Sequence, residues 1–132
     1  MIDKNIGIIN YSNNCYLNVI IQLFLSYKDT SNIICNYIDY EKDKNLFSPL
    51  ELMNLLSNKI DITKQNDSHE VFIQILDKIK ELEYFFVNKV QNTYTCQLCN
   101  KSRKVMDVFS TFYVHNNSLE GSIKEMIKDE IF

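Results

Sequence analysis

The chain has little that would direct it to a membrane, to nucleic acid or to the secretory pathway. Its longest apolar run is interrupted by Gln22 and then by Ser26–Asp29, so no segment reaches the roughly 20 apolar residues of a transmembrane helix. The net charge is −3, which differs from the basic balance of a nucleic-acid-binding protein. Residues Asp3 and Lys4 stand where a signal peptide would have its apolar core. We therefore expect an intracellular protein with no nucleic-acid partner and no membrane partner.

Glycine and proline are also scarce, with two residues and one residue respectively, and tryptophan is absent. The sequence has no repeat, no low-complexity tract and no linker-like stretch, so 132 residues predict one domain, or an incomplete one, with a moderate core. The sequence contains four cysteines and no export signal. We expect these cysteines to be reduced and to have catalytic or metal-binding roles.

Helical periodicity dominates the first part of the chain. Residues 15–27 are apolar on nearly every face and predict a buried helix, and residues 30–40 predict a second, weaker one. Residues 40–47 are polar and predict a loop. Ser48 and Asp67 each precede a helical pattern and are followed three residues later by glutamate, so both are predicted to cap helices. The buried stripe of the helix after Asp67 is predicted to contain Val71, Phe72, Ile75, Leu76, Ile79 and Leu82.

The pattern changes from helical to extended in the last third of the chain. Residues 85–95 and 104–114 are rich in β-branched and aromatic side chains, which predicts two strands joined by Cys96–Asn100. Helical spacing then returns. The predicted fold class is α+β, with a helical part over about residues 1–82, a short β ribbon over about 83–114 and a final helix over 118–131.

Cys15 lies where the polar turn Tyr11–Asn14 meets the apolar helix. A helix N-terminus has unpaired N–H groups and a dipole that favour negative charge, and the thiolate is the reactive form of cysteine. The position therefore predicts an activated nucleophile. The alternative is a small buried apolar side chain, as is usual for a lone cysteine. That alternative is the preferred interpretation for Cys35, which lies among isoleucines and Tyr37.

Three stretches, in order along the chain, resemble the ubiquitin-specific proteases, a family of papain-like cysteine peptidases. Residues 7–18, G-I-I-N-Y-S-N-N-C-Y-L-N, are similar to the cysteine box G-L-x-N-x-G-N-T-C-Y-x-N, with Ser12 and Asn14 in place of the usual glycine and threonine. Residues 65–72, Q-N-D-S-H-E-V-F, are similar to Q-Q-D-A-H-E-F-L. Residues 94–113 are similar to the fingers region, including the first C-x-x-C of its zinc site.

This resemblance implies a role for each stretch. Cys15 would be the nucleophile that attacks the carbonyl joining the ubiquitin C-terminal glycine to its lysine or peptide partner, and Asn10 would donate to the developing oxyanion. The partner would be ubiquitin or a ubiquitinated protein, and catalysis would require no cofactor. The implied fold is the helical thumb and the start of the fingers of a truncated papain-like peptidase. Residues that would help to bind the ubiquitin tail are Gln65, Asp67, His69 and Glu70.

Cys96 and Cys99 have the spacing of a metal knuckle. A structural zinc takes four ligands, and only these two are close together in the sequence, with His115 as a distant third candidate. We interpret the pair as half of a possible structural zinc site. His115 is expected to be exposed, and His69 is expected to form hydrogen bonds at a helix start rather than to act as the catalytic base.

The histidine box and the second C-x-x-C of the family lie downstream of the matched stretches, and neither histidine here has a G-H-Y-like context. Members of a catalytic triad act as a unit, so activity depends on the source of the base. Three hypotheses follow. The first is a deubiquitinating cysteine peptidase completed by a second chain or by an extension of this one. The second is an inactive remnant that binds ubiquitin or another protein, and the third is a zinc-knuckle interaction module whose knuckles are shared across a dimer.

Overall fold

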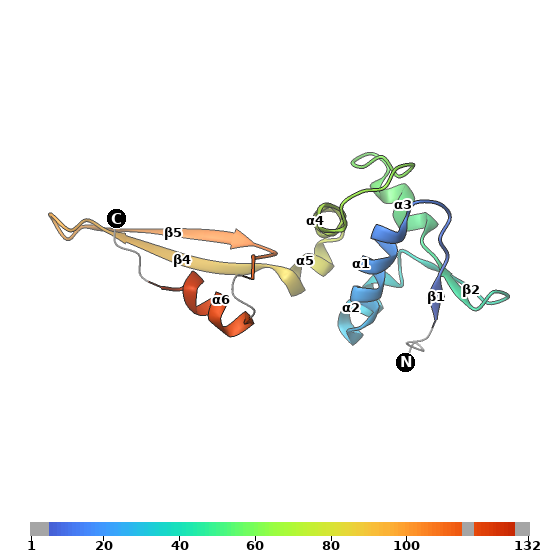
Figure 1. Cartoon of the computed structure of the whole chain (residues 1–132), viewed down its shortest axis with the longest axis horizontal. Helices are drawn as coiled ribbons and strands as arrows, with labels where there is room; N and C mark the ends of the chain where they lie inside the picture. Colours follow the sequence, from blue (N-terminus) through green and yellow to red (C-terminus); the bar gives the residue numbers. More distant parts are fainter. Residues whose placement is uncertain (1–5, 115–117, 129–132) are drawn as a thin grey trace. The chain divides into compact units, whose positions relative to one another are not determined.

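The computed structural model describes residues 6–114 and 118–128 and confirms a small α+β fold. The chain forms two compact units, residues 1–85 and residues 86–132 (Figure 1). The elements in chain order are β1 (Gly7–Ile8), α1 (Cys15–Leu25), α2 (Lys28–Ile34), β2 (Asp39–Glu41), β3 (Leu46–Ser48), α3 (Leu50–Leu56), α4 (Ser68–Lys78), α5 (Lys80–Phe86), β4 (Asn88–Thr95), β5 (Ser102–Phe109) and α6 (Leu119–Met126).

The core of the first unit forms where α1 packs against α2 and α4. The Phe24 ring of α1 stacks on the Phe72 ring of α4 with centroids 5.9 Å apart. The six side chains of the predicted buried stripe after Asp67 are all buried, so that prediction is confirmed. The prediction that α1 is buried on nearly every face is wrong in one respect. Val19 is 61% exposed and Leu23 is 39% exposed, because these residues lie one turn apart on a stripe of α1 that no other element of the first unit covers.

A small sheet replaces two predicted features of the first unit. The predicted helix over residues 30–40 ends at Ile34, and the predicted loop over 40–47 contains the antiparallel pair β2–β3 instead. Strand β1 adds to β3 in parallel, with Gly7 opposite Leu46. A Cβ at Gly7 would lie 2.8 Å from Leu46 Cδ2, so the absence of a side chain permits this close approach.

The two predicted helix caps have different outcomes. Asp67 caps α4, since its carboxylate accepts hydrogen bonds from the main-chain N–H groups of His69 (2.7 Å) and Glu70 (3.3 Å). Ser48 does not cap α3. It is buried in β3, and its hydroxyl lies 3.0 Å from the Tyr11 hydroxyl, 37 residues away in the sequence. The prediction of a cap was wrong because the Ser48 hydroxyl is hydrogen bonded to Tyr11, far away in the sequence, and not to the start of α3.

The second unit is a β ribbon with one helix. The hairpin prediction is confirmed, but the second strand begins and ends earlier than predicted, so β4 and β5 pair from Asn88↔Phe109 to Thr95↔Ser102. The final helix, α6, starts after Ser118, whose hydroxyl accepts the N–H of Gly121 at 3.1 Å. Residues 129–131 of the predicted helix lie outside the described residues. In the described part of the chain, no helix is both long enough and apolar enough to cross a membrane.

Candidate active site around Cys15

Cys15 is the first residue of α1 and is exposed, so the predicted placement at a helix start is confirmed. The first turn of α1 has no acidic residue that would oppose a negative charge at this position. An exposed thiol at a helix N-terminus can react with an external electrophile, whereas a sulfur buried in the core cannot. The exposure of Cys15 therefore removes the support for the alternative of a buried apolar side chain.

The residue before the cysteine, Asn14, organises the loop. Its side chain is fully buried. The Asn14 Oδ1 accepts the main-chain N–H of Ser12 at 3.3 Å, and Nδ2 donates to the carbonyl of Ile9 at 3.3 Å and to Oδ1 of Asn18 at 3.0 Å. Burial without such partners would cost about 1–3 kcal/mol for each unsatisfied group. These hydrogen bonds therefore fix the backbone that leads into Cys15.

Asn10 enters the site through the same network. The carbonyl of Ile9, which forms the peptide bond to Asn10, accepts hydrogen bonds from Nδ2 of both Asn14 and Asn18, at 3.3 and 3.5 Å. The peptide bond between Ile9 and Asn10 therefore lies beside the first turn of α1. Its own side chain is exposed and has no hydrogen-bond partner within the described residues. An amide with free N–H groups at this place is suited to donate to a bound ligand.

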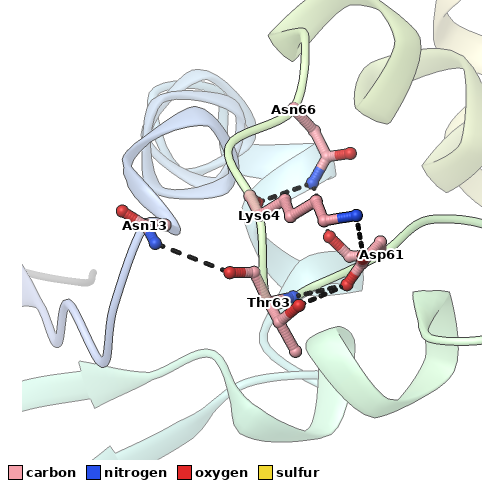
Figure 2. Close-up of polar contacts among 5 residues, drawn as sticks. All are labelled: Asn13, Asp61, Thr63, Lys64 and Asn66. Carbon is pink, nitrogen blue, oxygen red and sulfur yellow. Dashed lines mark hydrogen bonds and ion pairs between the residues drawn. The ribbon is translucent and has the colours of Figure 1, made fainter.

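Asn13 supplies the sharp turn before α1. Its φ is 49°, in the left-handed region that asparagine adopts more readily than most other residues. The left-handed residue is Asn13 and not Ser12, so the serine at the usual glycine position of the cysteine box causes no backbone strain. The Asn13 Nδ2 also donates to the carbonyl of Thr63 at 3.5 Å (Figure 2). This contact joins the cysteine loop to the segment that precedes α4.

That segment is held by its own polar contacts (Figure 2). Asp61 accepts the main-chain N–H of Thr63 at 3.1 Å and pairs with Lys64 Nζ at 3.1 Å. Asn66 Nδ2 donates to the carbonyls of Asp61 at 3.0 Å and of Lys64 at 2.9 Å. The Thr63 hydroxyl, followed by Lys64, lowers the pKa of the Asp61 carboxyl by hydrogen bonding to its charged form. The loop therefore has a defined shape where it meets Asn13.

The structure joins the cysteine loop to the segment just before the second matched stretch, and the helices that follow the two, α1 and α4, pack together. The four predicted tail-binding residues, Gln65, Asp67, His69 and Glu70, are exposed around the start of α4. They follow the Thr63 carbonyl that binds Asn13, and α4 packs against α1. Asp67 also has a structural role, since its carboxylate caps α4. The expected hydrogen bonding of His69 at the helix start is seen in its main-chain N–H, which donates to Asp67.

Cys96 and Cys99 lie in the second unit, at the turn of the β4–β5 ribbon, and both are exposed. Hydrogen bonds from the main-chain N–H groups of Cys99 and Leu98, and from the Cys99 thiol, lower the pKa of the Cys96 thiol. Within residues 6–114 and 118–128, no three metal-binding side chains gather at one place. The third predicted candidate, His115, lies outside the described residues.

The remaining cysteine, Cys35, is half-buried, and burial raises the pKa of its thiol, with a smaller opposite effect from Ser31. All four thiols are free. Sequence reasoning missed Asn14 and Asn18 as members of the site, although two asparagines four residues apart across a helix start are a pattern that predicts such a pair.

No model of a known protein family matches the chain, and no curated protein matches it.

Proposed function

We propose that this chain is part of a ubiquitin-specific-protease-like domain with a papain-like fold, and that Cys15 is its nucleophile. The observation that carries the proposal is the exposed thiol at the first position of α1, on a loop fixed by the fully buried Asn14. The contact of that loop with Thr63, two residues before the second matched stretch, also supports it.

In the proposed reaction, the Cys15 thiolate adds to the carbonyl carbon of the last glycine of ubiquitin. The Asn10 amide and the main-chain N–H of Cys15 stabilise the oxyanion, and loss of one such donor typically costs about 10²–10³ in rate. The C–N bond then breaks, the amine leaves with a proton from a general acid, and water hydrolyses the thioester. We propose that this acid is a histidine supplied by an extension of the chain or by a second polypeptide.

The exposed side chains of Gln65, His69 and Glu70 would bind the ubiquitin tail. They stand at the end of α4 that follows the loop in contact with Asn13. An extended tail entering beside Cys15 would meet these hydrogen-bonding groups before its last residue reached the thiol. Asp67 would act mainly by holding the start of α4 in place, since its carboxylate is already bound to two main-chain N–H groups.

The test is the reaction of the purified chain with ubiquitin that carries a C-terminal electrophile, followed by intact-mass measurement. We expect one adduct on the parent chain and on Cys35→Ser, none on Cys15→Ala, and slower formation with Asn10→Ala. An adduct that persists in Cys15→Ala would contradict the proposal. Binding of unmodified ubiquitin by a folded chain that forms no adduct would instead support the inactive, ubiquitin-binding alternative.

A further inference from the structure

A cavity of about 280 Å³ lies between the β4–β5 ribbon and α6, within the second unit. The register of the ribbon explains its floor. Val90 pairs with Asp107, and side chains two residues apart along a strand point to the same face. Asn92 and Phe109 therefore share that face with them, and Met126 of α6 contributes to the lining.

Most of the cavity wall is apolar. Phe112, which follows the ribbon, meets the Phe109 ring edge to face with centroids 6.4 Å apart. Val90 and Met126 add two aliphatic side chains to these rings. The volume is just below the roughly 300–1,000 Å³ of pockets that hold drug-sized ligands. The cavity is therefore suited to a slender group such as a short alkyl chain.

One carboxylate interrupts the apolar wall. Asp107 is the only acidic residue in the stretch 86–114. The basic residues of the same stretch are Lys89, Lys101, Arg103 and Lys104. Among the described residues, Asp107 forms no ion pair with any of them, and Lys89 and Lys104 point to the opposite face of the ribbon. The charge of Asp107 is thus left for a cation that enters the cavity.

The neighbour of the carboxylate is arranged to accept a donor as well. The Asn92 Nδ2 donates to Asp107 Oδ2 at 2.5 Å, which directs the two N–H groups of the amide toward the acid. Its Oδ1 has no hydrogen-bond partner in the part of the chain that the structure describes. A ligand at this place meets acceptors from both side chains. An ammonium group, with three N–H donors and no acceptor, matches them.

We propose that this cavity binds an alkylammonium group. The ammonium donates to the Asp107 carboxylate and to Asn92 Oδ1, and the alkyl stem packs against Val90 and Met126. The rings of Phe109 and Phe112 add the attraction of aromatic faces for a cation. A free aliphatic amine and a lysine side chain of another protein both carry this chemistry. The inference does not depend on the proposed peptidase function.

The probe is pentylamine, which is protonated at neutral pH, and the readout is the amide spectrum of the uniformly ¹⁵N-labelled full chain. We expect saturable shifts that centre on β4, the end of β5 and the end of α6, and that include the side-chain amide of Asn92. Pentanol has the same stem without the charge and should bind about tenfold more weakly. Equal affinity for the two compounds would overturn the inference, because it would show an apolar packing gap only.

Matched variants test the carboxylate. Asp107→Asn removes the charge but keeps an oxygen that can accept from Asn92, so it should weaken pentylamine binding about tenfold and leave pentanol binding unchanged. Glu120→Gln neutralises an exposed acid of α6 outside the cavity lining and should change neither affinity. Met126→Trp fills the cavity and should abolish binding of both compounds. The dispersion of each spectrum reports whether the variant is folded, and unchanged pentylamine binding by folded Asp107→Asn would overturn the inference.

A second ligand distinguishes the two sources of the ammonium. Nα-acetyl-lysine amide carries the same group and a similar stem on a peptide backbone. Tighter binding of this compound than of pentylamine would support the site and identify a protein side chain as its ligand. Tighter binding of pentylamine would support the site and identify a free amine. Absence of saturable shifts with both would overturn the inference and would leave the test of Cys15 with the ubiquitin electrophile unaffected.

Discussion

The two units bury very different amounts of apolar surface. Every buried apolar side chain of the described residues belongs to the first unit, from Tyr16 to Leu82. In the described part of the second unit, Ser122 is the only buried residue. Met106 and Val108 of β5 are more than half exposed. Burial of apolar surface is the main stabilising contribution to folding, whereas a two-stranded ribbon alone is marginally stable. The difference indicates that the first unit is the more stable of the two.

The proposed active site stands on the better-packed unit. Cys15 and Asn10 need a fixed geometry. Cys15 begins α1, and the loop that holds Asn10 is bonded to α1 and to the segment before α4. The Cys96–Cys99 turn lies at the end of a ribbon in which no described apolar side chain is buried. The following predictions test this contrast.

The largest contrast is expected in amide hydrogen exchange. The amides of α1 and α4 should exchange only when the first unit unfolds, whereas those of β4 and β5 should exchange through local opening at much lower free energy. Mass-spectrometric exchange on the metal-free chain measures both. Faster exchange in the helices up to Leu82 than in residues 84–114 would show that the contrast is wrong.

Next in size is the loss of a core ring. Phe24 is fully buried and stacked on Phe72, so Phe24→Ala should lower the free energy of unfolding of the first unit by about 3–5 kcal/mol. The matched change in the ribbon, Met106→Ala, removes a side chain that is 55% exposed and should alter stability by less than about 0.5 kcal/mol. Chemical denaturation compares the two variants, and equal effects would contradict the account.

A smaller effect is expected from the amide that holds the cysteine loop. Asn14→Ala removes three hydrogen bonds and leaves a buried gap, which should destabilise the first unit by about 1–3 kcal/mol. Asn92→Ala, which removes an exposed hydrogen bond to Asp107 in the ribbon, serves as the control and should cost less. Chemical denaturation again measures the free energy of unfolding of each variant. An unchanged value for Asn14→Ala would show that the network does not fix the loop.

Tyr16→Phe should stabilise the first unit slightly. The Tyr16 hydroxyl is the one buried side-chain oxygen or nitrogen of the described residues without a hydrogen-bond partner. An unpaired buried hydroxyl is unfavourable, so its removal should raise the free energy of unfolding by about 1 kcal/mol. A loss of stability in the thermal or urea transition would mean that the hydroxyl has a partner in solution.

The smallest effect is the pH dependence of the loop before α4. The pKa of Asp61 is lowered in the folded state, so its contribution is complete above the unfolded pKa of about 3.9 and is lost as the pH falls through the lower folded value. The stability difference between the parent chain and Asp61→Asn should therefore be present at neutral pH and vanish in acid. A difference that is independent of pH would contradict this role for the carboxylate.

The helices with continuous apolar spacing and local start signals could be predicted from the sequence. Asp67 caps α4 as expected because its partners are only two and three residues away. The pairing of β2 with β3 was not predicted, and neither was the use of Ser48 by Tyr11, because both depend on contacts between distant residues. Sequence patterns report local preference, and such long-range contacts can override it.

The candidate site was predictable in its position but not in its construction. Cys15 was expected at a helix start and is found there. Asn14 was noted only as a departure from the usual threonine, although its buried amide connects Ile9, Ser12 and Asn18. The role of such a residue becomes visible only when its burial and its partners are known.

The central claim is that Cys15 is the thiol that ubiquitin reaches, although Cys96 and Cys99 are also exposed. The most direct measurement is peptide mapping after reaction of the reduced parent chain with a limiting amount of the ubiquitin electrophile. The same electrophile on the isolated tail peptide serves as the reference. The account predicts that ubiquitin labels Cys15 alone, and much faster than the tail peptide does. Labelling of Cys96 or Cys99, or equal rates for ubiquitin and the peptide, would contradict it.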